Sequence, residues 1–71
     1  MQTTTIAIEL NGRKREVREG ETVAELVAEL ELRPGMVAVE VNGVLVTRER
    51  RESTVLRPGD QVEMVTIMGG G

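Results

Sequence analysis

The last three residues, Gly69, Gly70 and Gly71, are the feature of the sequence that a folded core does not explain. Glycine has no side chain to pack and is costly to order, so we expect residues 69–71 to form a flexible tail. Three extended residues span about 10 Å, enough to enter a narrow slot in another protein. The tail ends in an α-carboxylate, which is ionised at neutral pH and is a poor electrophile. The carboxyl carbon of Gly71 therefore has to be activated, for instance as an acyl adenylate, before it can react.

The chain itself offers no means of that activation. It contains no Cys and no His, which removes the usual nucleophile, the usual general base and the usual zinc ligands. Its one aspartate, Asp60, and its one lysine, Lys14, do not make a catalytic set, and there is no phosphate-binding loop. We expect no catalytic residue, no metal site and no bound cofactor, so an enzyme partner has to activate the tail. The alternative is that the glycines are only a frayed end.

The composition excludes several classes of protein. A net charge of −3 and the absence of Phe, Trp and Tyr argue against a nucleic-acid binder, which needs basic patches and aromatic stacking. No apolar run approaches the roughly 18 residues of a membrane-spanning helix. The first residues lack the basic region and apolar stretch of a secretory signal. We therefore expect a cytoplasmic protein without nucleic-acid or membrane partners, monomeric when free.

The first half of the chain predicts a β-hairpin. Residues 4–10 alternate between apolar and polar types, and Asn11-Gly12 is a strong signal for a two-residue turn. The register that this turn imposes pairs Glu9 with Lys14 on one face and Ile6 with Val17 on the other. Because opposite charges and apolar groups meet in the same register, the two signals support each other.

A helix is predicted to follow the hairpin. Thr22 and Glu25 match a capping box, and apolar residues then recur at helical spacing. The helix is expected to end near Leu32, because Pro34 disfavours a helical conformation in the residue before it. Gly35 suits the exit turn.

The second half predicts a further hairpin, a loop and a last strand. In order, it consists of an alternating strand over residues 36–41, an Asn42-Gly43 turn, a short strand over 44–46, a charged surface loop over 47–54, a type II turn over 57–60 and a strand over 61–68. This order predicts an α+β domain over residues 1–68, with a mixed sheet of four to five strands and one main helix on one face. If the first and last strands are both central they run parallel, which is the ubiquitin-like β-grasp fold. Other small α+β topologies fit the same order.

The last strand is the candidate docking surface for a partner. Its apolar residues lie on both faces, with Val62, Met64 and Met68 on one and Val65 and Ile67 on the other. One face should pack on the helix, and the other can form an exposed apolar patch of the kind that marks a partner site. The alternative is that the loop before the strand covers Val65 and Ile67.

Two charged segments have a simpler interpretation. Arg48, Arg50 and Arg51, with Arg57 nearby, could dock an acidic partner, but the glutamates between them favour a solvated loop. The glutamates between residues 16 and 31 lack the Asp-rich spacing of a metal-binding loop, so we interpret them as a solubilising face around the helix.

Three segments together resemble the ThiS family of sulfur carriers. They are Glu21-Thr-Val-Ala-Glu-Leu26, Val37-Ala-Val-Glu-Val-Asn-Gly43 and, most specifically, the Gly59-Asp60-x-Val62-Glu63-x-Val65 run that leads into the terminal glycines. The resemblance spans essentially the whole chain. It implies that Gly71 carries the sulfur and that Gly69 and Gly70 form the functional tail, in a protein that is not an enzyme.

The resemblance also implies partners. A ThiF-like enzyme would use ATP and Mg²⁺ to adenylate the Gly71 carboxylate, and a cysteine desulfurase or sulfurtransferase would supply sulfur to make a thiocarboxylate. A ThiG-like thiazole synthase would accept that sulfur in thiamine biosynthesis. The alternatives are a MoaD-type carrier for molybdopterin, another thiocarboxylate carrier, a ubiquitin-like modifier that joins Gly71 to a lysine, and an interaction module without chemistry.

Overall fold

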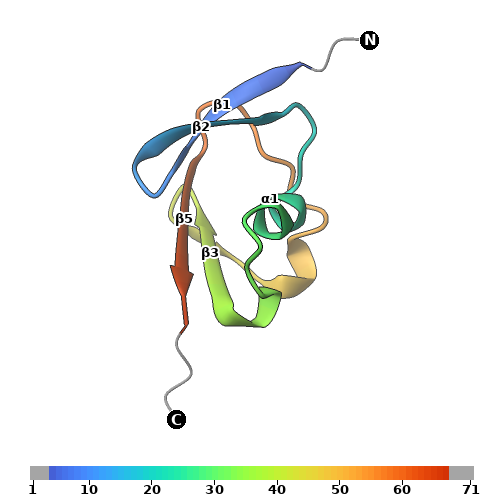
Figure 1. The fold of residues 1–71 in the computed structure, drawn as a ribbon, viewed down its shortest axis with the longest axis vertical. Helices are drawn as coiled ribbons and strands as arrows, with labels where there is room; N and C mark the ends of the chain where they lie inside the picture. The colour runs from blue at the N-terminus through green and yellow to red at the C-terminus, as the bar shows by residue number, and fades with distance from the viewer. Residues whose placement is uncertain (1–3, 68–71) are drawn as a thin grey trace.

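In the part of the chain that the structure describes, five strands form one mixed sheet and a single α-helix packs across one face of it (Figure 1). The computed structural model describes residues 4–67, so the predicted tail over 69–71 and the apolar Met68 lie outside the described residues. The elements are β1 (Thr5–Leu10), β2 (Arg13–Arg18), α1 (Val23–Glu29), β3 (Val37–Val41), β4 (Val44–Val46) and β5 (Gln61–Thr66), with short 3₁₀ turns at Pro34–Met36 and Arg48–Arg50. The last strand is therefore shorter than the range predicted for it.

The strand order confirms the predicted β-grasp fold. The strands follow one another across the sheet as β2-β1-β5-β3-β4. β5 runs parallel to β1 and antiparallel to β3, and the other two pairs are antiparallel hairpins. The strand that leads to the C-terminus is thus the central strand of the sheet.

Both hairpins have the predicted turns. The central residues Asn11 and Gly12 have φ values of 50° and 81°, and Asn42 and Gly43 have 53° and 83°. Positive φ at both central residues is the type I′ geometry, whose twist matches that of the flanking strands. The first hairpin has the predicted register, in which Glu9 lies opposite Lys14.

The helix begins as predicted but ends earlier. The Glu25 N–H donates to the Thr22 hydroxyl and the Thr22 N–H donates to the Glu25 carboxylate, which completes the capping box. The prediction of an end near Leu32 is wrong, because α1 ends at Glu29 and Glu31 adopts a left-handed φ of 57°. The Leu32 N–H then bonds the Val27 carbonyl at 3.3 Å, as in a Schellman motif. The exit turn is therefore made at Glu31 and not at Gly35, which lies in a 3₁₀ turn.

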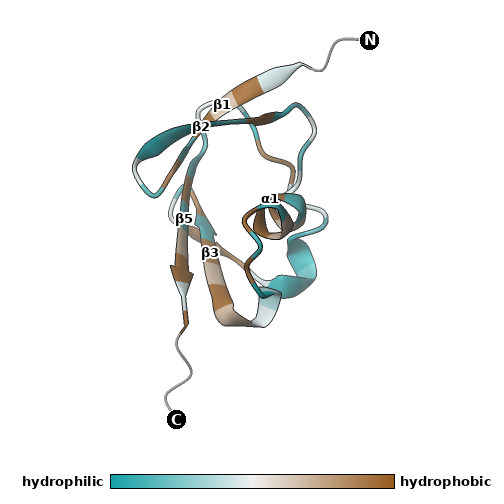
Figure 2. Cartoon of the chain, in the orientation of Figure 1, coloured by the Kyte–Doolittle hydropathy of each residue, from teal (hydrophilic) through white to brown (hydrophobic). Residues whose placement is uncertain are grey.

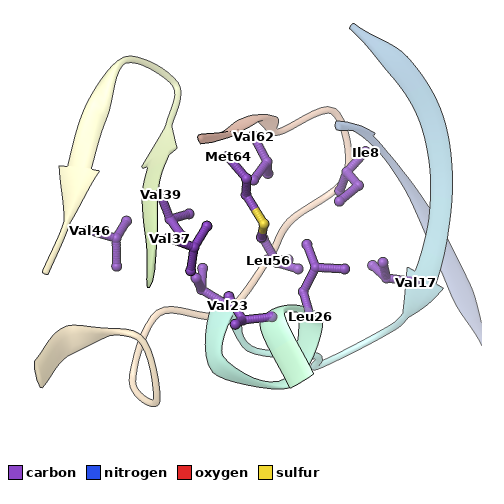
Figure 3. Close-up of a cluster of buried hydrophobic side chains, with 11 residues drawn as sticks. Ile8, Val17, Val23, Leu26, Val37, Val39, Val46, Leu56, Val62 and Met64 are labelled. Carbon is purple, nitrogen blue, oxygen red and sulfur yellow. The ribbon is translucent and has the colours of Figure 1, made fainter. Parts of the chain in front are cut away.

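The core is entirely aliphatic apart from one methionine. Figure 3 shows side chains from α1 and from the sheet pointing toward one another. The buried members are Ile8, Val17, Val23, Leu26, Val27, Val37, Val39, Val46, Leu56, Val62 and Met64. Hydrophobic colour follows β3 and the end of β5 in Figure 2, whereas β2 at the edge of the sheet is largely hydrophilic.

The prediction of a solvated loop over residues 47–54 is wrong for Arg51. This side chain is only 6% exposed, and its two terminal nitrogens donate to the carbonyls of Pro34 and Val37 at 2.9 and 2.7 Å. The main-chain carbonyl of Arg51 accepts from the N–H of Ala24 in the first turn of α1. The loop therefore joins the start of the helix to the start of β3.

Replacing Glu31 with glycine should stabilise the domain. A left-handed φ strains any residue with a Cβ atom, and glycine avoids that strain. We expect Glu31→Gly to raise the free energy of unfolding by about 1 kcal/mol, measured by urea denaturation followed by far-UV circular dichroism. Glu31→Ala is the matched control, because it removes the same charge but keeps the strain. Equal stability of the two variants would contradict the explanation.

Candidate functional site

The candidate site is the end of β5, from which the chain continues toward Gly71. The type II turn before β5 has Gly59 at a φ of 84°, and the Asp60 N–H bonds the Arg57 carbonyl at 3.1 Å. The Gly59 N–H donates to the Ala7 carbonyl in β1, which places the start of β5 alongside that strand. At its other end, the Ile67 N–H donates to the Met36 carbonyl at 2.7 Å. The main chain is therefore held by its neighbours up to the last described residue.

Two asparagine side chains hold the edges of β5. The β1 ladder pairs with β5 only as far as Leu10 opposite Val62. The Asn11 amide extends it by one step, because its oxygen accepts from the Met64 N–H at 2.8 Å and its nitrogen donates to the Met64 carbonyl at 3.2 Å. The sequence predicts this asparagine only as a turn residue. A side chain that copies a strand's hydrogen bonds is not visible in the sequence.

Asn42 plays the corresponding role on the opposite edge. Its side-chain oxygen accepts from the Gln61 N–H at 2.9 Å, and its nitrogen donates to the Asp60 carboxylate at 3.0 Å. Asp60 in turn accepts from the Arg57 N–H at 2.9 Å. The two Asn-Gly turns therefore position the central strand as well as reversing the chain.

The two faces of β5 have different fates. Val62 and Met64 are 1% and 8% exposed and belong to the core. Their proposed part in a docking surface is therefore corrected, since a buried side chain has no surface to offer a partner. Val65 and Ile67 are 63% and 51% exposed, so the preceding loop does not cover them. Their role in docking stays a prediction, and Met68 lies outside the described residues.

Two pockets flank the helix without bringing reactive groups together. One, of about 340 Å³, lies beside the end of β5 and is lined by Leu10, Asn11, Leu30, Leu32, Val37, Met64 and Thr66. The other, of about 250 Å³, is lined by Ala24, Val27, Pro34, Arg48, Arg51 and Glu52. Residues 4–67 contain no group of three or more acidic, Cys or His residues able to hold a metal. None of the helices within that range is long and apolar enough to span a membrane.

The interpretation of the helix glutamates as a solubilising face is wrong for Glu21. Its side chain is buried, and its Oε1 accepts from the Arg18 N–H at 3.3 Å. Arg18 and Arg15 reach Glu29, the neighbouring carboxylate, at 3.9 and 3.6 Å. The Oε2 atom of Glu21 is buried without a hydrogen-bond partner. Burial raises the pKa of Glu21, and the adjacent Glu29 carboxyl raises the pKa of Glu21 further.

The comparison with protein families shows which family the chain belongs to. The model of the ThiS family matches residues 4–71, a range that includes β5 and the terminal glycines. The chain belongs to the ThiS family of sulfur carriers. It is therefore a carrier and not an enzyme, as the resemblance implied.

Individual relatives agree with this assignment. The chain is 30% identical to the sulfur carrier protein ThiS of Escherichia coli strain K12 over 61 residues, which cover 86% of this chain and 92% of that protein. The crystal structure of the thiamine biosynthesis protein ThiS from Geobacter metallireducens matches with a TM-score of 0.80 and 35% identity, covering 93% of this chain and 100% of that one. The chain is also 39% identical over 64 residues to the thiazole synthase of Magnetococcus marinus. That match covers 90% of this chain, which spans only 20% of the length of the synthase.

Removing the Asn11 side chain should weaken the hold on β5 in this ThiS-family domain. Glycine keeps the left-handed turn conformation but loses both hydrogen bonds to Met64. We expect Asn11→Gly to lower the free energy of unfolding by about 1–2 kcal/mol and to speed hydrogen exchange at the Met64 N–H. Asn11→Asp keeps the acceptor for the Met64 N–H and loses the donor to the Met64 carbonyl. Its free energy of unfolding should lie between those of the original chain and of Asn11→Gly. Unchanged exchange at Met64 in Asn11→Gly would rule out this role.

The buried Glu21 should make stability depend on pH. Its pKa is raised in the folded chain, so between the ordinary glutamate pKa and the raised one the folded state binds more protons than the unfolded state. Stability contributed by the protonated group is therefore lost as pH rises through that window. We expect Glu21→Gln to gain stability relative to the original chain as pH rises from about 4 to neutrality. Urea denaturation across this range is the measurement.

A matched variant separates this effect from net charge. Glu49 is exposed in the 47–54 loop, so Glu49→Gln changes the net charge equally without removing a buried carboxyl. Its stability should run parallel to that of the original chain at every pH. The explanation fails if the Glu21→Gln curve is parallel as well.

Proposed function

We propose that this chain carries sulfur as a thiocarboxylate on Gly71 and delivers it for thiazole formation in thiamine biosynthesis. The observation that supports this most strongly is the match to the ThiS family over residues 4–71. The relatives point to the same pathway, since one is named a sulfur carrier protein and another a thiamine biosynthesis protein. The M. marinus relative is named a thiazole synthase.

The chemistry takes place on the terminal carboxyl group. The Gly71 carboxylate attacks the α-phosphorus of ATP in a ThiF-like enzyme that binds Mg²⁺, pyrophosphate leaves, and an acyl adenylate forms. A persulfide sulfur, supplied by a cysteine desulfurase or sulfurtransferase, then attacks the carbonyl carbon and AMP leaves. Reduction of the resulting acyl disulfide by a thiol releases the thiocarboxylate. The sulfur finally passes to the thiazole synthase.

The composition of the chain supports this location for the sulfur. A protein without cysteine cannot hold a persulfide itself, which leaves the terminal carboxyl group as the place to attach sulfur. Adenylation also needs no residue of the carrier beyond its tail, because the partner supplies ATP and the metal.

The fold supports delivery of the tail to a partner. The main chain of β5 is hydrogen-bonded as far as Ile67, so the point from which the tail leaves is fixed relative to the rest of the domain. Val65 and Ile67 are exposed beside this point, and we include them in the surface that meets the adenylating enzyme and the thiazole synthase. In the M. marinus protein, a region similar to this chain is part of the synthase polypeptide itself, which favours a ThiG-like partner here.

Intact-mass spectrometry tests the proposal directly. The chain is incubated with a ThiF-family enzyme, ATP, Mg²⁺ and a sulfur donor, and we expect a mass increase equal to the exchange of one oxygen for sulfur, mapped to Gly71. Deleting Gly71 retracts the carboxylate by one residue, about 3.5 Å, which should slow the exchange by at least about a hundredfold. The unfolding midpoint of the truncated chain should be unchanged.

The possible results separate the remaining candidates. An unchanged mass alongside an active control carrier would contradict the proposed activation. An unchanged rate in the truncated chain would show that Gly71 is not the sulfur-bearing residue. High-mass conjugates linked to lysine, without a free thiocarboxylate, would indicate a protein modifier instead.

A further inference from the structure

Two glutamates face each other across the centre of the sheet without a positive partner. Glu40 in β3 and Glu63 in β5 are directly opposite in the antiparallel register. The bonds from Asn42 N–H to the Gln61 carbonyl and from Ile67 N–H to the Met36 carbonyl fix the phase of this ladder. They make Glu40 and Glu63 a hydrogen-bonded pair, with Cα atoms about 5.5 Å apart. Both side chains therefore leave the sheet on the same face, opposite α1.

Nothing in the described chain compensates these two charges. Both residues are exposed, and neither takes part in an ion pair between residues 4 and 67. Like charges directly opposite on neighbouring strands destabilise a sheet. Elsewhere on the same face the register has the opposite arrangement, because Glu9 lies across from Lys14. The acidic pair is thus a local feature of β3 and β5 and not a property of the whole face.

Apolar side chains border the acidic pair on the β4 side and toward the end of β5, whereas the exposed polar residues Gln61 and Asn42 occupy the next positions in the other direction. Leu45 lies opposite Glu40 on the other side of β3 and is 59% exposed. The next residue of β5 on the same face as Glu63 is the exposed Val65, which is paired with Ala38. We call Ala38, Glu40, Leu45, Glu63 and Val65 the exit face, because it spans β4, β3 and β5, the strand that leads toward the tail. The exit face combines an apolar surface with two adjacent negative charges.

Resting on the proposed function, we propose that the exit face docks the adenylating enzyme through an apolar patch that carries an arginine, whose guanidinium group lies between Glu40 and Glu63. A guanidinium is planar and offers donors in more than one direction, so a single arginine can bond two carboxylates. Val65 and Leu45 add exposed apolar surface next to the pair, and a protein surface can cover it whereas a free ion or a small solute cannot. Charge complementarity of this kind raises the rate of association and makes it dependent on salt.

A divalent metal ion is a poorer occupant than arginine. The residues that the structure describes offer no third acidic, Cys or His ligand for a metal at this pair, and metal binding would leave the exposed apolar residues uncovered. An arginine from a protein surface satisfies both parts of the exit face at once. The adenylating enzyme is the partner that has to hold this domain while the tail reaches its nucleotide, so the surface beside the tail is the one it must meet.

Binding measurements with charge-neutral variants test this proposal. The affinity for a ThiF-family enzyme is measured by calorimetry without ATP, at low and at moderate salt, for the original chain, Glu40→Gln, Glu63→Gln and the double variant. We expect the double variant to bind about tenfold more weakly at low salt and to lose most of the salt dependence. Val65→Ser should also weaken binding, but without changing the salt dependence. Each variant alters an exposed side chain, and its fold is checked by circular dichroism.

The matched control is Glu9→Gln, which removes one negative charge from the same face at a site already paired with Lys14. It should bind within about twofold of the original chain. The urea midpoints of Glu40→Gln and Glu63→Gln should rise, because each variant removes the same repulsion, and the double variant should gain less than the sum of the two. This gain in stability together with a loss of affinity distinguishes docking from a structural role.

The outcomes are distinct from those of the mass assay. Equal affinity of the double variant and the original chain, or no binding by the original chain, overturns the docking proposal even if the thiocarboxylate forms. Charge-dependent binding without a mass change supports docking and contradicts the proposed sulfur chemistry. If Glu9→Gln binds more weakly by the same factor as Glu40→Gln or Glu63→Gln, the effect comes from net charge in general. That result would overturn the assignment of Glu40 and Glu63 as the docking pair.

Discussion

The position of β5 between β1 and β3 is the constraint on which the rest of the structure depends. A central strand must bury one face under the helix and pair both of its edges, and here it must also release the C-terminal segment. The side chains of Asn11 and Asn42 accept hydrogen bonds from the Met64 and Gln61 N–H groups, and Asn11 also donates to the Met64 carbonyl, which completes the pairing of β5 where the neighbouring strands turn away. The turn before β5 is fixed to β1 at its start. The last described residues are therefore part of the sheet, which gives the tail a defined point of departure.

The small aliphatic core explains why a charged side chain, that of Arg51, is buried in the interior. A chain of this size buries only about 60% of the surface that it exposes when unfolded, and it has no aromatic residue to fill the space beside the helix. Arg51 fills that space with its alkyl chain and satisfies two main-chain carbonyls with its guanidinium group. Its own carbonyl and that of Thr54 accept from the first turn of α1, so the loop caps the helix. Breaking these contacts would leave main-chain N–H groups at the start of α1 and main-chain carbonyls around the start of β3 without hydrogen-bond partners.

Local signals made the hairpins, the capping box and the order of elements predictable from the sequence. Asn-Gly turns and the Thr22–Glu25 pair need only a few neighbouring residues, and the structure confirms them. The buried roles of Arg51 and Glu21 depend on groups distant in the sequence, so charge alone suggested solvent exposure. The helix ended early because Glu31 adopts a conformation for which glycine is the usual signal. At the candidate site, alternation separated the two faces of β5, but burial was needed to show that only the Val65 face is free.

Two acidic sites have unfavourable electrostatics: the buried Glu21 and the exposed pair Glu40 and Glu63. They differ in whether the fold itself compensates the negative charge. Burial and the neighbouring Glu29 carboxyl disfavour the charged form of Glu21, yet the Arg18 guanidinium lies 3.7 Å from its carboxylate and partly offsets this. Glu40 and Glu63 are exposed and receive no such contact within the described chain. Natural proteins are stable by a small margin. An uncompensated repulsion at the centre of a sheet therefore lowers the stability of the domain, and no interaction within the described domain offsets this loss. The Glu40–Glu63 pair lies beside the exposed apolar residues of the strand that leads to the tail. A positive group that compensates the pair is therefore best sought in a partner and not in the fold.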